Sequence, residues 1–173
     1  MVLVVLAAVC PRPTFAQAPS MSEPAVKAGL LFNFAKFTDW PADQLAPTAP
    51  ISLCVVDPAV AASLETLAAG KSIGTHPLIV TRVKLDESIR ACMILYAGKL
   101  DSKKQDQLIA LLAGASTLTV GDAEDFAVRG GMIGFFVDQG RMRFAVNRDA
   151  VQRTRLTLSS QLLNYAKLVR NGP

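Results

Sequence analysis

The chain has 173 residues, of which 51% are hydrophobic and 18% are charged, and its formal net charge is +4. This length predicts one domain, large enough to bury about two-thirds of the surface of its unfolded chain. The apolar content excludes disorder for most of the chain. The positive charge is compatible with a nucleic-acid site or with a solvated or partner-facing surface. Because no long run of lysine and arginine occurs, we favour the surface and expect no nucleic-acid partner.

The N-terminal residues predict export. Residues 1–10 form an apolar run that is too short to span a membrane. Small residues ending at Ala16 or at Ala18 match the sites that signal peptidase cuts. We favour the cut after Ala16, because Pro19 disfavours the one after Ala18.

This cut divides the chain into a signal peptide over residues 1–16, a flexible N-terminus over 17–23 and one domain over 24–171, in a periplasmic protein. Two other interpretations of the N-terminus are a buried strand and a lipoprotein signal that ends at Cys10. No later segment reaches the roughly 18 apolar residues of a membrane helix. We therefore expect no direct insertion of the mature protein into a membrane.

The first element of the domain is predicted to be a helix that ends near Pro41. Ser22 is its expected cap, and Pro24 suits its first turn. Apolar side chains follow at helical spacing, namely Val26, Leu30, Leu31, Phe34 and Phe37. Pro41 disfavours helical geometry at Trp40, which sets the predicted end of the helix.

Apolar runs of strand length then alternate with helical patterns. The predicted strands cover residues 51–56, 77–83, 91–98 and 116–121, and the predicted helices cover 58–70 and 101–114, with a brief helical turn capped by Asp122. Strands that are apolar throughout are typical of a sheet interior covered on both faces. The alternation predicts the α/β class: a single-domain sandwich with a mixed, mostly parallel sheet flanked by helices.

Four glycines between residues 129 and 147 raise the question of a phosphate-binding loop. Such a loop follows a strand and opens into a helix, whose N-terminus holds the phosphates. Here a helical turn comes before the glycines and a strand comes after them, so this interpretation fails. Residues 132–137 and 142–146 instead predict two antiparallel strands, with Gly140 in the turn between them. The glycines shape a hairpin.

The second strand of this hairpin alternates in polarity, which predicts a half-buried strand. One face carries Met142, Phe144 and Val146, and the other carries Arg141, Arg143, Ala145 and Asn147. After the hairpin, residues 159–170 predict a terminal helix with apolar side chains on one face.

No catalytic constellation is recognisable in the sequence. There is no G-x-S-x-G motif, and the single histidine, His76, precedes a proline. Asp122, Glu124 and Asp125 fit capping and dipole compensation better than a pair of catalytic carboxylates. No CxxC motif indicates a metal site. We therefore expect a non-enzymatic protein without a metal or cofactor.

Two cysteines remain after removal of the signal peptide, Cys54 and Cys92, each early in an apolar run. If their strands are neighbours, which lie about 4.8 Å apart, a disulfide is geometrically feasible in an oxidising compartment. It would stabilise the fold by about 3–4 kcal/mol in the chain-entropy model. The alternative is a pair of buried free thiols.

Five stretches in order resemble one family, the YfiR family of periplasmic regulators. They cover residues 30–41, 51–58, 92–98, 130–147 and 156–169. The resemblance implies a small periplasmic α/β protein, often a homodimer. It also implies a partner, because the best-known member represses a membrane-anchored diguanylate cyclase by binding its periplasmic sensor region, which lowers cyclic di-GMP and disfavours biofilm.

The resemblance also implies redox sensitivity through disulfides, but two positions depart from the family pattern. A second cysteine pair is missing, with Ala127 and Gly134 in its place, and Ala145 stands where the family has a glutamate. These departures put a redox switch and an identical binding mode in doubt.

The candidate partner-binding residues are Arg141, Arg143 and Asn147 on the outer face of the hairpin, with Trp40 after the first helix. Trp40 also fits a core position, and the arginines also fit an exposed strand protected from edge-to-edge pairing. Two other functions are open. One is a small-ligand binding module, which would need a pocket at the carboxyl edge of the sheet; the other is a hydrolase or transferase.

Overall fold

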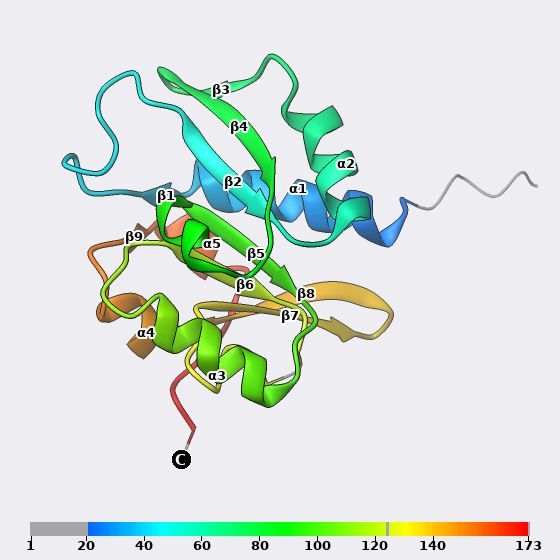
Figure 1. Ribbon diagram of the computed structural model, residues 1–173. Coiled ribbons are helices and arrows are strands. Elements are labelled where there is room, and N and C mark those ends of the chain that lie inside the picture. The colour runs from blue at the N-terminus through cyan, green and yellow to red at the C-terminus, as the bar shows by residue number, and fades with distance from the viewer. Residues whose placement is uncertain (1–20, 124, 173) are drawn as a thin grey trace, which may run out of the picture.

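A computed structural model describes residues 21–123 and 125–172 (Figure 1). The predicted signal peptide, and residues 17–20 of the predicted flexible N-terminus, lie outside the described residues. The helices are α1 (Glu23–Lys36), α2 (Pro58–Ala68), the 3-10 helix η1 (Glu87–Ala91), α3 (Ser102–Leu111), α4 (Arg148–Gln152) and α5 (Ser160–Leu163). The strands are β1 (Thr38–Asp39), β2 (Ile51–Val55), β3 (Ser72–Ile73), β4 (His76–Arg82), β5 (Ile94–Gly98), β6 (Leu118–Gly121), β7 (Ile133–Asp138), β8 (Arg141–Asn147), β9 (Thr157–Leu158) and β10 (Lys167–Val169).

Eight of the strands form one mixed sheet in the order β10-β8-β7-β6-β5-β2-β4-β3. The pairs are parallel except for β7 with β8 and β3 with β4. Strands β1 and β9 form a separate antiparallel pair. The predicted α/β class, with a mostly parallel sheet flanked by helices, is therefore confirmed.

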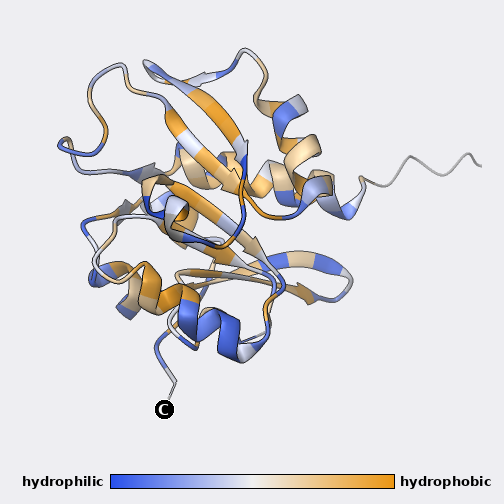
Figure 2. Ribbon diagram, in the orientation of Figure 1, coloured by the Kyte–Doolittle hydropathy of each residue, from blue (hydrophilic) through white to orange (hydrophobic). Residues whose placement is uncertain are grey.

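Strand β5 shows how the two faces of the sheet are covered. Ile94 and Tyr96 belong to the large core under α1 and α2, whereas Leu95 and Ala97 belong to a smaller core under α3. Consecutive side chains of a strand point to opposite faces, so α1 and α2 cover one face and α3 covers the other (Figure 1). Hydrophobic residues follow the inner strands, and hydrophilic residues occupy the end of the β7–β8 hairpin (Figure 2).

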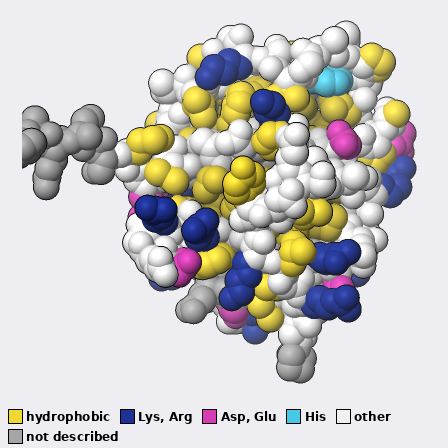
Figure 3. All heavy atoms as spheres, turned by 180° about the vertical axis from the view of Figure 1, so that it is seen from behind, with side chains coloured by type: hydrophobic (Ala, Val, Ile, Leu, Met, Phe, Trp, Pro, Cys, Tyr) yellow, Lys and Arg dark blue, Asp and Glu magenta, His cyan; other side chains and the backbone are white. Residues whose placement is uncertain are grey.

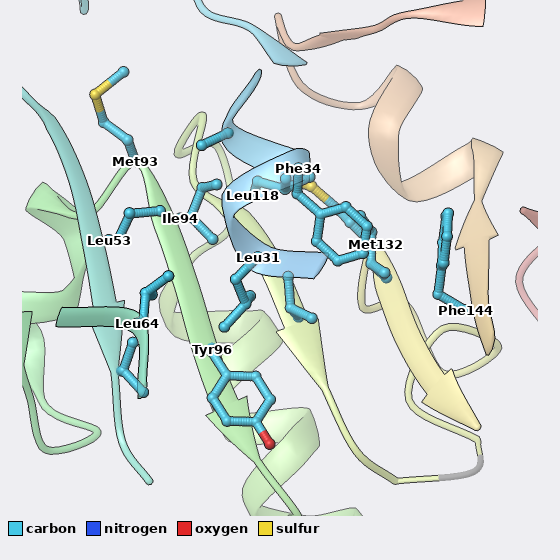
Figure 4. Packing of buried hydrophobic residues seen from close by; sticks show 14 of the residues in the cluster. Leu31, Phe34, Leu53, Leu64, Met93, Ile94, Tyr96, Leu118, Met132 and Phe144 are labelled. Carbon is cyan, nitrogen blue, oxygen red and sulfur yellow. The ribbon is translucent and has the colours of Figure 1, made fainter. Parts of the chain in front are cut away.

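Helix α1 is shorter than predicted. It ends at Lys36, because Thr38 and Asp39 pair with β9 instead of continuing the helix. The buried face is also shifted relative to the predicted stripe: α1 buries Ala28, Leu31, Phe34 and Ala35, together with Lys27. Figure 4 shows Leu31 and Phe34 pointing from α1 toward the strands.

The predicted hairpin is confirmed, and its turn has two residues. Gln139 and Gly140 both have a positive φ, 48° and 72°, which is the conformation of a type I′ turn between strands. At two positions before the hairpin, glycine is required for lack of space and not for the backbone conformation. A side chain at Gly131 or at Gly121 would collide with the ring of Phe126, which is fully buried between them.

The predicted terminal helix is wrong beyond its first turn. Helix α5 ends at Leu163, and residues 167–169 form β10, which runs parallel to β8 and pairs with Ala145, Val146 and Asn147. The apolar periodicity of this segment fits a helix, but a strand here supplies hydrogen bonds to the otherwise free edge of β8. Pairing with β10 therefore outweighs the local helical pattern.

Candidate partner-binding surface

The turn end of the β7–β8 hairpin exposes both basic and apolar side chains. Arg141 and Arg143 are exposed, as predicted, and Val137 on the neighbouring strand is 68% exposed. Tyr165, which follows α5, is 76% exposed. Tyrosine and arginine are the residue types that contribute most often to protein interfaces. This part of the surface thus has the composition of a binding site.

Three hollows adjoin the hairpin and share residues with one another. One of about 670 Å³ lies between α1, β8 and α5, and shares Arg143 and Tyr165 with a second of about 380 Å³. A third of about 550 Å³ shares Met142 with the first and Phe136 with the second. The hairpin is therefore surrounded by concave surface.

A rigid aromatic cluster lies beneath the first hollow. The ring of Phe34 is 5.1 Å from that of Phe144 in an edge-on arrangement and 5.8 Å from that of Phe135. Figure 4 shows Phe34 and Phe144 at neighbouring positions of this core. On the other side of the sheet, the ammonium of Lys167 lies 5.7 Å from the centre of the Phe136 ring, which is within the range of a cation–π contact.

Asn147 lies on the same face of β8 as Arg143, as the alternation predicts, but it is not exposed as expected for a partner-binding residue. It is fully buried, because the turn at Ala127, the start of α4 and Asn171 after β10 enclose its side chain. Its Nδ2 donates to the carbonyl of Ala127 and to Oδ1 of Asn171, and its Oδ1 accepts from the backbone N–H of Ala150. Asn147 thus caps α4 and ties the C-terminal residues to the body of the protein.

Trp40 and Ala145 are also buried, at 9% exposure each. Trp40 belongs to the large core, which agrees with the interpretation of Trp40 as a core residue and not as a partner-binding one. The exposed part of the predicted outer face is therefore limited to Arg141 and Arg143.

The structure joins Cys54 and Cys92 in a disulfide, with their Cα atoms 5.8 Å apart. Strand β2 pairs with β5, so that Leu53 lies opposite Ile94. Cys92 comes just before β5, not within a strand as predicted. Both cysteines are 5% exposed and belong to the core under α3, so the bond connects β2 with the start of β5.

A buried polar cluster, formed by Lys27, Asp122 and Tyr96, was missed by the sequence analysis. Oδ2 of Asp122 accepts from Nζ of Lys27 and from the hydroxyl of Tyr96, each at 2.5 Å. Nζ of Lys27 also lies 2.6 Å from Glu23. Asp122 was predicted to cap a brief helical turn, and the described residues 125–130 that follow it form turns. The only sequence signal was a lysine among the apolar residues of a helix.

Burial and nearby carboxylates act in opposite directions on the pKa of Lys27 and in the same direction on the pKa of Tyr96. For Lys27, burial is the largest single influence and lowers the pKa, but Asp122 and Glu23 together raise it above its ordinary value. Burial, followed by the hydrogen bond to Asp122, raises the pKa of Tyr96 far above its ordinary range. The Lys27 ammonium is therefore charged and Tyr96 neutral at physiological pH. Figure 4 shows the Tyr96 hydroxyl pointing away from the apolar side chains.

Within the described residues, no group of three or more potential metal ligands occurs. Nδ1 of His76, at the start of β4, lies 2.8 Å from the carbonyl of Ala49. No helix in residues 21–123 or 125–172 is long and apolar enough to cross a membrane. Seen from behind, lysines and arginines form small separate groups, several of them beside acidic side chains (Figure 3).

Comparison with known proteins identifies the family. The model of the YfiR/HmsC-like family matches residues 24–167. No curated protein matches the chain. Among solved structures, a conserved domain protein from Vibrio cholerae O1 biovar El Tor str. N16961 is similar in fold, with a TM-score of 0.52 and 16% sequence identity. The similarity covers 86% of this chain, which spans 60% of that protein. The chain therefore belongs to the YfiR/HmsC-like family.

Proposed function

We propose that this protein is a non-enzymatic periplasmic regulator that binds the periplasmic sensor region of a membrane-anchored diguanylate cyclase and represses it, which lowers cyclic di-GMP. We choose the surface around the β7–β8 hairpin on the basis of one observation. Exposed Tyr165, Arg141 and Arg143 gather around the hairpin, where three hollows meet. Exposed apolar side chains beside arginines favour a protein partner.

A second candidate function is the binding of a small ligand. One observation favours it: Lys27, Lys99 and Asp122 line the 550 Å³ hollow, and residues 99 and 122 directly follow β5 and β6. Ligands of open α/β sheets bind beyond the carboxyl ends of the strands. A thermal-shift screen with metabolites separates the two functions, because a large shift with one compound favours the ligand-binding module.

The direct test of the proposed function is the cellular level of cyclic di-GMP, with and without the gene. Deletion should raise cyclic di-GMP, and the exported protein should restore the lower level. A version that lacks residues 1–16 should not restore it, because it would not reach the periplasm. An unchanged level on deletion would contradict repression of a cyclase.

The double variant Arg141→Glu/Arg143→Glu connects the cellular effect to the hairpin. It should be exported and folded, yet fail to lower cyclic di-GMP. Full activity of this variant would place the contact elsewhere on the molecule. We also propose that the protein forms a homodimer. Light scattering of the purified protein tests this by its molar mass.

A further inference from the structure

Beside the side chains that α1 buries against the sheet, a flank of the helix that includes the edge of buried Phe34 borders a hollow. Leu30, Asn33, Phe34 and Phe37 follow one another at the spacing i, i+3, i+4 and i+7, and all four line the 670 Å³ hollow. This is the spacing by which a helix packs against another element. Leu30 and Phe37 are only partly buried. One flank of α1 thus has the pattern of a helix interface and faces a hollow.

The opposite wall of this hollow continues the same pattern. Met142 and Phe144 of β8 form its base, and Leu162 and Tyr165 at α5 form its far side. We name this hollow the α1–β8 groove. Helix α1 packs against α2 on its other flank. A helix in the groove would therefore lie beside α1 on the flank away from α2, next to Met142, which is partly buried, and Phe144, which is 6% exposed.

The groove has a length and a charge that select its occupant. Residues 30 to 37 of α1 span about 10 Å at 1.5 Å per residue, or about two helical turns. Among the described residues, Arg143 is the one charged residue that lines the groove. Nζ of Lys36 lies 5.4 Å from the ring of Phe37 at the border of the groove. No described acidic side chain lines it. An occupant with carboxylates beside its apolar anchors would match this charge.

We propose that the α1–β8 groove binds an amphipathic helix of the partner protein, with apolar anchors at positions i, i+4 and i+7 and acidic residues on the flanks facing Arg143 and Lys36. This inference rests on the proposed function and specifies how that partner is held. Helix-in-groove binding places such anchors in an apolar groove. The fixed contacts of Phe34 with Phe135 and Phe144 keep the groove in shape before binding, which reduces the cost of ordering.

A second copy of this chain fits the groove poorly. The carboxylates on its longer helices are already engaged: Glu23 with Lys27, Glu65 with Arg82, and Asp106 with Arg129. A helix from another copy would thus have no free acidic flank among these residues. The charge of the groove favours a different protein.

The first test uses two synthetic helical peptides with the same leucine anchors. One has glutamates on its flanks, and the other has lysines at the same positions. In fluorescence anisotropy with the full mature protein, the glutamate peptide should bind at least tenfold more tightly. Equal binding of the two peptides, or no binding of either, would overturn the proposed groove chemistry.

Variants locate the binding. Tyr165→Ala should weaken binding of the glutamate peptide about tenfold or more, and because Tyr165 is 76% exposed, the variant should fold. The matched control is Ile79→Ala on β4, an exposed apolar residue at 48% near the far edge of the sheet; it should bind as the unaltered protein does. Leu30→Asp adds a carboxylate to the α1 wall and should abolish binding. If Ile79→Ala and Tyr165→Ala bind equally well, the groove is not the site.

The purified periplasmic region of the cyclase separates this inference from the proposed function. The glutamate peptide should compete with it for the protein. Binding of the cyclase region that the peptide does not displace, and that Tyr165→Ala does not weaken, would overturn the groove while retaining the proposed function. Failure of the cyclase region to bind at all would overturn the proposed function instead. A third outcome would reject a partner helix: the unaltered protein forms a homodimer and binds neither peptide, and Leu30→Asp loses the homodimer. This result would identify a second copy of the chain as the occupant of the groove.

Discussion

The two halves of strand β8 differ in what their side chains do. Arg141 and Arg143, near the turn, extend into solvent and have no ion pair with any described residue. Asn147, on the same face four residues after Arg143, is buried and makes three hydrogen bonds. The difference arises because β10 pairs only with the second half of β8 and brings Asn171 to the side chain of Asn147. Residues on one face of one strand can thus serve binding or stability, depending on what covers them.

The protein thus has two parts: a hairpin end, which carries the exposed Arg141 and Arg143, and a body, which contains Asn147 and the other buried residues. Substitutions in the body should lower the free energy of unfolding. Substitutions at the hairpin end should leave that free energy unchanged and alter binding alone.

The largest effect is expected in the body, from the disulfide. The bond closes a separation of 38 residues, for which the chain-entropy model gives about 3–4 kcal/mol. The double variant Cys54→Ala/Cys92→Ala should therefore lower the free energy of unfolding by about this amount in urea titrations. A reducing agent should destabilise the unaltered protein similarly and leave the variant unchanged. If reduction has no effect on the unaltered protein, the two thiols are free in solution.

The next effect is expected at Asn147. Asn147→Ala removes the cap of α4 and leaves the buried carbonyl of Ala127 without this donor. Losing a cap and a buried hydrogen bond should cost about 2 kcal/mol. The control Asn164→Ala, at an exposed position, should change stability by less than about 0.5 kcal/mol.

The variant Asn147→Asp tests the reason for this loss. Its carboxylate can still accept from the N–H of Ala150, but it cannot donate to Ala127. Its stability should lie below that of the unaltered protein, because the Ala127 carbonyl remains without this donor. If Asn147→Ala is as stable as the unaltered protein but binds the partner more weakly, Asn147 belongs to the hairpin end after all.

A smaller effect, per pH unit, is expected from the cluster of Lys27, Tyr96 and Asp122. The pKa values of Lys27 and Tyr96 are both raised in the folded state. Their contribution to stability is therefore complete below the pKa values of the unfolded chain, near 10 and 10.5, and is lost as the pH rises above them. Each group should lower the free energy of unfolding by up to about 1.4 kcal/mol per pH unit in that range.

Urea titrations between pH 8 and pH 11 measure this loss. In Tyr165→Phe, Tyr96 is the only tyrosine, so ultraviolet absorbance reports its ionisation alone. The absorbance change of this variant should coincide with unfolding. Ionisation of Tyr96 in the folded protein near pH 10 would show that the hydroxyl is not held by Asp122.

The sequence was informative where local patterns decide the structure. Alternating apolar strands and helices predicted the α/β sheet, and Gly140 predicted the hairpin turn. The sequence failed where distant segments meet. The periodicity of residues 159–170 could not reveal that Lys167–Val169 pairs with β8, and therefore it could not reveal the burial of Asn147.

The candidate site shows the same division. Arg141 and Arg143 were identified because they lie near a turn, where exposure follows from local structure. Tyr165 was placed on a predicted helix, and only the folded chain brings it to the groove beside Arg143. The 95 residues that separate Lys27 from Asp122 likewise left no local pattern for their ion pair.

The smallest change in stability is expected at the hairpin end, where Arg141→Glu/Arg143→Glu should alter the free energy of unfolding by less than about 0.5 kcal/mol. Binding should respond strongly, because exposed charges at the rim of an interface guide association. Association of the unaltered protein with the partner should slow as salt rises, whereas the variant should associate slowly at every salt concentration. Arg90→Glu, an exposed charge reversal within η1, is the control. If both charge reversals slow association equally, the overall charge of the protein guides the encounter and the hairpin end has no special role.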